Sequence, residues 1–237
     1  MKWSLAIVAV ALVAVFWLTD SWRFIKTIYL IARVSPYEQS GVDNKKILIL
    51  GDSTGYGTGA SQSADSIAGL IGSDFPTFSI INNSINGRTI GELVSVTESM
   101  STKYEIIVLQ IGGNDIIQKR NIDQVMLELD LIYKNLNLLT KNIVMISAGN
   151  VGAATAFSGK HAADYQTLSK RFHKRAELFA QEREGFEYIN LFEEPETDPF
   201  VLHPNLYLSI DGLHPSSEGY KLWYEKLKPS LLRIIKL

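Results

Sequence analysis

The chain has 237 residues, of which 46% are hydrophobic, so it is long enough for one α/β domain with a sizeable core and a short extra segment. Its formal net charge at pH 7 is −2 and it has no basic block, which argues against a nucleic-acid partner. It contains no cysteine, which excludes a disulfide framework, a thiolate metal site and a cysteine nucleophile.

The chain begins with a strongly apolar segment. Residues Trp3 to Leu18 include one polar residue, Ser4, and Lys2 precedes them. A positive start followed by an apolar run is also typical of a cleaved signal peptide, but Thr19 to Arg23 provides no small-x-small cleavage site. We therefore predict an uncleaved transmembrane or signal-anchor helix.

A second, amphipathic helix is predicted directly after the anchor. Between Trp22 and Ala32, apolar residues recur at spacings of three and four, as in a helix that lies in the membrane interface or docks on the domain. The basic residues that follow the anchor favour a cytoplasmic domain. We predict that residues 1–34 form the anchor and its interfacial helix and that residues 35–44 form a linker.

From Lys45 onward, apolar runs alternate with segments of helical periodicity. Strand patterns occupy residues 47–50, 78–82, 106–111, 143–147 and 186–191, and helical patterns occupy residues 63–72, 89–99, 121–139, 165–182 and those from 216 onward. Pro229 is expected to kink or restart the last helix. This alternation predicts a three-layer α/β/α sandwich around a five-stranded parallel sheet, a flavodoxin-like fold spanning residues 45–237.

The first predicted strand ends in a turn that contains a serine. Ile47 to Leu50 is followed at once by Gly51, Asp52 and Ser53. Open α/β sheets bind ligands at the carboxyl ends of their strands, which is where this hydroxyl is expected. Turns are generally rich in these residues, so the motif alone is equally typical of a helix cap.

Three further stretches follow the same logic. The turn after the second strand holds Gly87, which can present a backbone N–H, and the turn after the third strand holds Asn114, which can present a side-chain amide. Before the last helix, Asp211 and His214 lie three residues apart on a loop. Each stretch alone is a common turn, but all of them fall at one edge of the predicted sheet.

In this order, the four stretches resemble the SGNH (GDSL-type) hydrolase family, over about Lys45 to the carboxyl terminus. The resemblance implies that Ser53 is the nucleophile and that Asp211 and His214 complete a catalytic triad. It also implies an oxyanion hole made of the N–H groups of Ser53 and Gly87 and the Asn114 amide. Thr54 replaces the leucine of the family's four-letter motif, a position without catalytic duty.

The chemistry of these side chains fits the implied roles. A serine hydroxyl needs a base, and His214 is the only histidine with a carboxylate in a suitable local frame. Asp52 and Asp115 are predicted to support the loops from a second shell. His161, His173 and His203 are given structural roles, and the histidines lack metal-ligand spacing, so no metal or cofactor is predicted.

Two alternatives stay open at this point. Gly55, Gly57 and Ala60 fit a dinucleotide-binding fingerprint after a strand, which would make the protein a nucleotide-binding module. The chain could also be a catalytically inactive scaffold on the same fold. The triad residues argue against both, because neither alternative gives Asp211 and His214 a purpose.

We therefore predict a serine hydrolase that cleaves an ester or thioester through an acyl-enzyme. The anchor favours lipid or cell-envelope acyl esters as substrates. The resemblance to the family implies an extracytoplasmic domain, whereas the charges that flank the anchor favour a cytoplasmic one. The small, glycine- and alanine-rich stretch from Asn150 to Lys160 is predicted to be a mobile loop over the acyl site.

Overall fold

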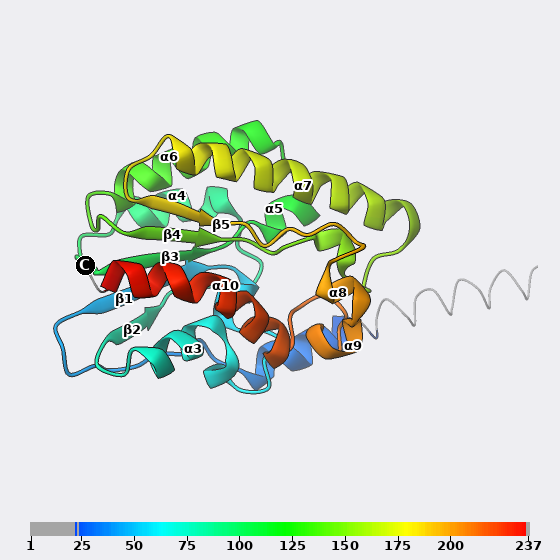
Figure 1. Cartoon of the computed structure of the whole chain (residues 1–237), viewed down its shortest axis with the longest axis horizontal. Coiled ribbons are helices and arrows are strands. Elements are labelled where there is room, and N and C mark those ends of the chain that lie inside the picture. The colour runs from blue at the N-terminus through cyan, green and yellow to red at the C-terminus, as the bar shows by residue number, and fades with distance from the viewer. Residues whose placement is uncertain (1–21, 23, 236–237) are drawn as a thin grey trace, which may run out of the picture.

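A computed structural model describes residue 22 and residues 24–235. The domain is built on one parallel sheet with strand order β2-β1-β3-β4-β5 (Figure 1). The strands are β1 (Lys46–Gly51), β2 (Ser79–Asn82), β3 (Ile106–Gln110), β4 (Ile143–Ile146) and β5 (Phe186–Ile189). The five strands and their parallel pairing confirm the predicted sheet.

The middle of the sheet is apolar on both faces. Every residue of β3 and β4 is buried, and so are five of the six residues of β1. Almost continuous apolar runs produce this pattern, because a strand covered on both sides by helices has no solvent-facing positions. Such runs are what the sequence shows at all three strands.

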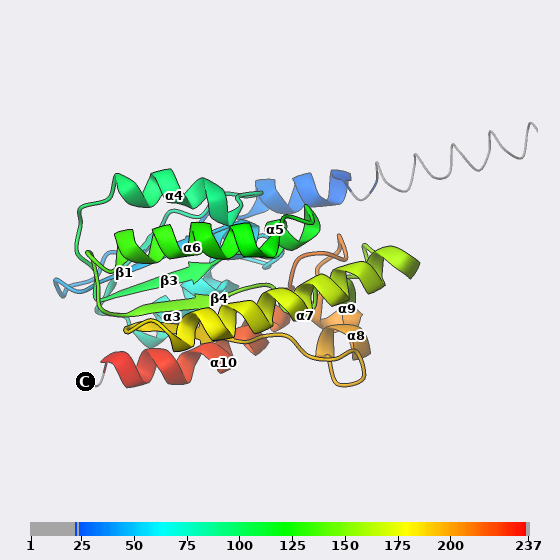
Figure 2. The same cartoon turned by 90° about the horizontal axis from the view of Figure 1, so that it is seen from above.

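Helices cover the two faces and complete the three-layer sandwich (Figure 2). On one face lie α4 (Ile90–Glu98), α6 (Ile122–Leu136) and α7 (Gly159–Gln181), and on the other lie α3 (Ile67–Asp74) and α10 (Ser217–Ile235). Leu48 and Leu50 of β1 face the first group, whereas Ile47 and Ile49 face the second. The side chains of β1 thus alternate between two separate cores, as the pleat of a strand requires.

The remaining helices after β1 are short. They are α2 (Ser53–Tyr56), α5 (Gly113–Ile117), α8 (Pro199–Leu202), α9 (Pro204–Tyr207) and the 3-10 turns η1 (Ser63–Asp65) and η2 (Val151–Ala153). The helices α2 and α5 directly follow β1 and β3, so they lie at the carboxyl edge of the sheet. The α8–α9 pair precedes the loop that carries Asp211.

Two helices differ from the sequence prediction. The helix α7 begins at Gly159, several residues before the expected start. The sequence did not indicate this start, because the first turns are solvent-exposed and carry no apolar periodicity. The helix α10 runs without interruption through Pro229. Proline has no N–H, so the carbonyl of Glu225 has no hydrogen-bond donor at Pro229. Both residues face solvent, where water can hydrate that carbonyl.

The segment before the domain packs against it. Residues 24–33 are helical, and Leu30 and the following Val34 are 4% and 7% exposed. The stretch predicted as a linker contacts β2, where Gln39 forms an antiparallel bridge with Ile80. The predicted anchor, Trp3 to Leu18, lies outside the described residues. Among residues 22 and 24–235, none of the helices is both long and apolar enough to span a bilayer.

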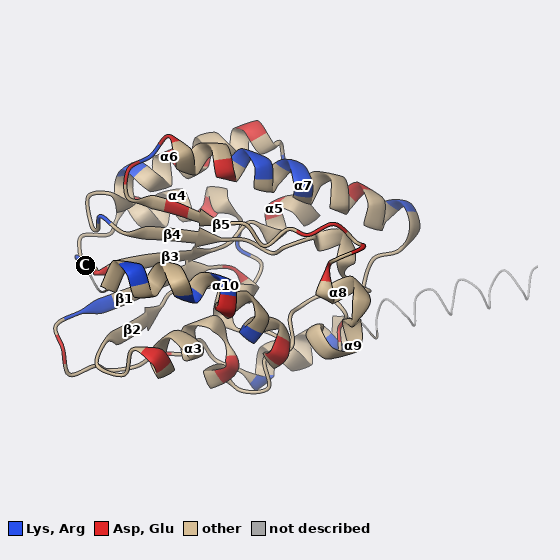
Figure 3. Ribbon diagram, viewed as in Figure 1, with Lys and Arg blue, Asp and Glu red and all other residues tan. Residues whose placement is uncertain are grey.

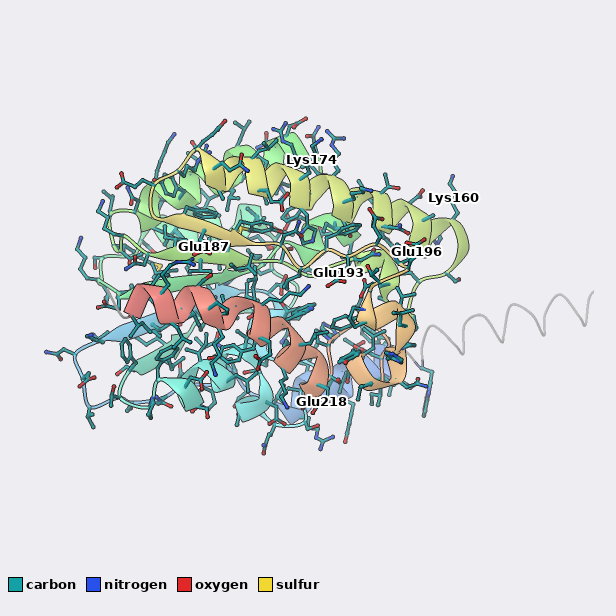
Figure 4. The ribbon with its side chains drawn as sticks, in the orientation of Figure 1. Lys160, Lys174, Glu187, Glu193, Glu196 and Glu218 are labelled. Atoms are coloured by element: carbon teal, nitrogen blue, oxygen red, sulfur yellow. The ribbon has the colours of Figure 1, made fainter. Side chains whose placement is uncertain are left out.

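Charged side chains are mixed on the outer helices. Figure 3 shows both signs interspersed along α6, α7 and α10. In Figure 4, the side chains of Lys160 and Lys174 point outward from α7.

Candidate active site

The turn after β1 places Ser53 at the carboxyl edge of the sheet. The N–H of Asp52 donates to the carbonyl of Gln110 on β3, which extends the ladder by one residue. The Asp52 carboxylate then accepts from the Thr54 N–H and hydroxyl, both at 2.8 Å. This cap starts α2 at Ser53, whose hydroxyl is left pointing away from the cap.

The loop between α9 and α10 presents the other two candidate residues. Its ends are joined by an antiparallel bridge between Leu208 and Pro215. Within it, Oδ1 of Asp211 accepts from the N–H groups of Leu213 at 3.0 Å and His214 at 3.1 Å. The carboxylate therefore folds its own loop and sets the direction of the imidazole.

The structure brings Ser53, His214 and Asp211 into one hydrogen-bonded row. His214 Nε2 lies 2.9 Å from Ser53 Oγ, and His214 Nδ1 lies 2.6 Å from Asp211 Oδ2. An ionised carboxylate can only accept hydrogen bonds, so His214 Nδ1 carries the ring proton. His214 Nε2 then accepts a hydrogen bond from the Ser53 hydroxyl. This tautomer is the one in which an imidazole can take the proton of a serine.

Electrostatics favour a charged Asp211. Burial raises the pKa of its carboxyl, but the hydrogen bond and charge of His214 and the two backbone N–H groups outweigh burial and hold the pKa below its usual value. Asp211 is therefore ionised at neutral pH. Its negative charge stabilises an imidazolium at His214 whenever that ring gains a proton.

Asn114 lies beside the row. Gly112, with φ +121°, turns the chain into α5, and the next residues line the same pocket as Ser53 and His214. One N–H of the Asn114 amide donates to the carbonyl of Arg88 at 3.0 Å, which fixes the amide and leaves the other for a ligand.

Gly87 is placed in the loop after β2, one residue before Arg88. Its φ is +82°, and a side chain at this position would meet only open space. The loop is tied to the end of β1 by a bond from the Ile85 N–H to the Gly51 carbonyl. Gly87 does not line the pocket itself, and its contribution to an oxyanion hole stays a prediction.

Asp115 connects the two loops. Its carboxylate accepts the N–H of Ile90, at the start of α4, at 3.0 Å and pairs with Arg120 at 2.6 Å. Burial raises the pKa of Asp115 despite these two partners. Asp115 thus anchors the end of the loop that contains Gly87 to the helix that carries Asn114.

Comparison with known proteins identifies the family of the chain. The profile of the GDSL-like Lipase/Acylhydrolase family matches residues 49–222. The chain belongs to this family. The match begins inside β1 and ends inside α10, so it contains Ser53, Gly87, Asn114, Asp211 and His214.

Solved structures share the fold of this GDSL-like chain. TesA is 17% identical with a TM-score of 0.59, and the alignment covers 80% of this chain and 99% of TesA. A catalytic mutant of Axe2, an acetylxylan esterase from Geobacillus stearothermophilus, is 19% identical with a TM-score of 0.55, covering 83% and 96%. A Clostridium thermocellum family 3 carbohydrate esterase is 17% identical with a TM-score of 0.59, covering 81% and 97%. No curated protein matches the sequence.

A pocket of about 80 Å³ adjoins Ser53 and His214 in this GDSL-like domain. Most of its wall is apolar, with Ile117, Val151, Ala153, Ala154, Leu191, Phe200, Leu208, Leu213 and Trp223. The predicted loop at residues 150–160 contributes through Asn150 and η2, so it contacts the site as expected. The sequence did not identify the contributions of Leu191, α8 and Trp223, because no local pattern relates these residues to Ser53.

Other parts of the protein pack closely against the glycine-rich turn after Ser53. A Cβ at Gly55 would lie 2.5 Å from Ser84 Oγ, and one at Gly59 would lie 2.3 Å from the Pro215 carbonyl oxygen. Gly57 packs in the same way on Ser66. These glycines allow close packing around the candidate site, which argues against the nucleotide-binding alternative.

The other described histidines lie elsewhere. His173 is buried, its Nε2 lies 3.0 Å from the Ala148 carbonyl oxygen, and its Nδ1 lies 2.7 Å from the Tyr188 hydroxyl. Burial lowers the pKa of His173, which suits a neutral structural role. Within the part of the chain that the structure describes, no three acidic or histidine side chains converge as a metal site would require.

Asn114 is predicted to donate to an oxyanion that exists only in the transition state. Replacing it with alanine is therefore expected to lower kcat by about 10²–10³-fold with little change in KM. Steady-state kinetics on a chromogenic acyl ester measure this effect. Asn44→Ala, an exposed asparagine before β1, is the matched control and should behave as wild type. A loss confined to KM would contradict the assigned role.

Asp52→Asn is expected to stabilise the protein above pH 6. Burial raises the pKa of Asp52 from 3.8 to about 6, so its ionisation opposes folding and stability falls as the pH rises between these values. Removing the charge should add about 1–3 kcal/mol to the free energy of unfolding at pH 8 and little at pH 4. Urea titrations at both pH values test this, and an equal change at both would refute the assignment.

Proposed function

We propose that this chain hydrolyses carboxylic esters or thioesters through an acyl-enzyme on Ser53. The observation that carries the proposal is the row from Ser53 Oγ through His214 to Asp211, with contacts of 2.9 and 2.6 Å, at the mouth of an apolar pocket. Membership of the GDSL-like lipase/acylhydrolase family supports the same reaction class.

The residues divide the reaction as follows. His214 Nε2 takes the proton of Ser53 as Oγ attacks the substrate carbonyl, and the negative charge that moves to the carbonyl oxygen is met by the N–H groups of Ser53 and Gly87 and by the Asn114 amide. His214 then gives its proton to the leaving alcohol or thiol. A water molecule, activated by the same imidazole, releases the acid and restores Ser53.

The pocket favours an apolar acyl group. Its wall is largely aliphatic and aromatic, so transferring a hydrocarbon chain from water into it is favourable. This supports a lipid or cell-envelope acyl ester as the substrate. A panel of nitrophenyl esters from acetyl to dodecanoyl, assayed with wild type and Ser53→Ala, tests the proposal. We expect Ser53-dependent turnover that rises beyond acetyl, and turnover that survives in Ser53→Ala would refute it.

We propose that the active-site end of the domain lies against a lipid surface. An apolar rim, defined as Trp22, Phe24, Ile25, Ile28, Tyr29, Leu202, Leu206 and Ile210, has exposed fractions between 49% and 66%. It flanks Asp211 on both sides, since residues 24–33 contact this loop and α9 leads into it. The apolar run from Trp3 to Leu18 precedes the rim in the sequence, which supports a bilayer as its partner.

The rim is tested in the full chain reconstituted in phosphatidylcholine vesicles. Ile25→Ser combined with Tyr29→Ser should reduce hydrolysis of an ester presented in the vesicles while leaving hydrolysis of a soluble ester unchanged, because both side chains are exposed. Equal rates on both substrates would refute a lipid contact. A dimer in detergent that the double substitution dissociates would instead assign the rim to a second copy of the chain.

A further inference from the structure

The helix that precedes the domain contacts the candidate triad. The hydroxyl of Thr27 donates to Oδ2 of Asp211 at 3.2 Å, across 184 residues of sequence. Thr27 lies outside residues 49–222, the range that matches the family profile. This contact therefore links the family domain to a segment outside the matched range.

Thr27 is the partner of Asp211 that comes from outside its loop. Oδ1 accepts from the N–H groups of Leu213 and His214, and Oδ2 accepts from His214 Nδ1 at 2.6 Å. All of these donors lie within three residues of Asp211. The Thr27 hydroxyl adds a second donor to Oδ2, the oxygen that faces the imidazole, and so opposes rotation of the carboxylate.

Packing fixes the position of this hydroxyl. Thr27 and Leu30 lie three residues apart, so they share one face of the helix, and the buried Val34 follows its last residue. Leu30 is 4% exposed, whereas Ile25 and Tyr29, on the opposite face of the helix, are both 52% exposed. The helix is thus held against the domain by the same face that carries Thr27.

We propose that Thr27 is a positioning residue that holds Asp211 in the orientation required by His214. The proposal rests on the proposed serine hydrolase function. Its consequence is that the helix at residues 24–33 forms part of the working active site, so that the segment leading to the apolar amino terminus is coupled to the triad.

Thr27→Val keeps the shape of the side chain and removes the donor. We expect kcat on a soluble ester to fall about tenfold with KM unchanged. Hydrogen bonds to charged groups are among the stronger ones, and only part of the energy of this bond contributes to stabilising the transition state. Thr27→Ser should restore most of the rate. Thr167→Val, whose hydroxyl donates only within α7, is the matched control and should match wild type.

The pH dependence separates positioning from packing. Without the Thr27 hydroxyl, more negative charge on Asp211 faces the imidazolium, so the acidic limb of kcat/KM should move to higher pH. Besides His214, two ionisable groups are coupled to this cluster. The charge of Asp52 interacts with His214, and burial raises the pKa of Tyr220 so far that its phenol stays neutral; both residues are unchanged in the variant. A simple loss of folded protein would lower the rate equally at every pH.

The proton NMR signal of His214 Nδ1–H provides a readout without turnover. It should shift in Thr27→Val and return in Thr27→Ser. An unshifted signal together with a kcat within twofold of wild type overturns the inference, as does an equal loss in the valine and serine variants. Failure of the proposed function is distinguishable, because wild type itself would then lack Ser53-dependent esterase activity.

Discussion

Ser53→Ala is expected to reduce kcat by at least about 10⁴-fold, to the level that binding and the oxyanion donors alone can support. The hydroxyl is the only atom in the described site that is both next to a base and directed at the pocket. In the proposed mechanism, no acyl-enzyme can form without this hydroxyl, and His214 has no alcohol to deprotonate. Initial rates on a short acyl ester measure the loss.

The fold should survive the Ser53 substitution. Asp52 caps α2 with its own carboxylate, so removing the Ser53 hydroxyl leaves the helix start intact. Thermal unfolding of Ser53→Ala should therefore resemble that of Ser99→Ala, an exposed serine at the end of α4 that serves as the matched control. Activity retained by Ser53→Ala would rule out the serine mechanism.

Asp211→Asn is expected to reduce kcat by about 10⁴-fold. An amide in place of the carboxylate can turn an N–H toward His214 Nδ1, which places the remaining ring proton on Nε2 and removes the acceptor for Ser53. The imidazolium would also lose its stabilising negative charge. Single-turnover kinetics should locate the loss in the acylation step.

The same substitution has a predicted effect on stability. The pKa of Asp211 is lowered in the folded state, so its ionised form stabilises the fold above the ordinary carboxyl pKa, and this contribution is lost on acidification through the lowered value. Asp211→Asn should remove that part of the pH dependence, whereas the exposed control Asp43→Asn should not. An Asp211→Asn variant with near-wild-type kcat would contradict the triad.

The sheet and its covering helices could be predicted because their patterns are local. Fully buried strands such as Ile106–Gln110 read as unbroken apolar runs, and α6 shows the helical spacing of an amphipathic helix. Ser53, Asn114 and His214 could be proposed because each lies in a turn directly beside such an element. The parallel topology then brings these turns to one edge.

The remaining features depend on contacts between distant parts of the chain. The pocket wall at Phe200 and Trp223 and the approach of Thr27 to Asp211 have no local pattern, since each is created by packing across the fold. The first turns of α7 were missed because exposed residues show no periodicity. The restart of the last helix expected at Pro229 does not occur, and the buried Leu227 and Leu231 pack on either side of this proline.

Mass spectrometry of the intact chain after reaction with a fluorophosphonate ester tests the central claim most directly. Such a reagent phosphonylates only a serine that a neighbouring base has activated. We predict a single adduct, located on the peptide that contains Ser53, absent in Ser53→Ala and formed far more slowly in His214→Ala. An adduct on another residue, or full ester turnover by a chain that forms none, would contradict the account.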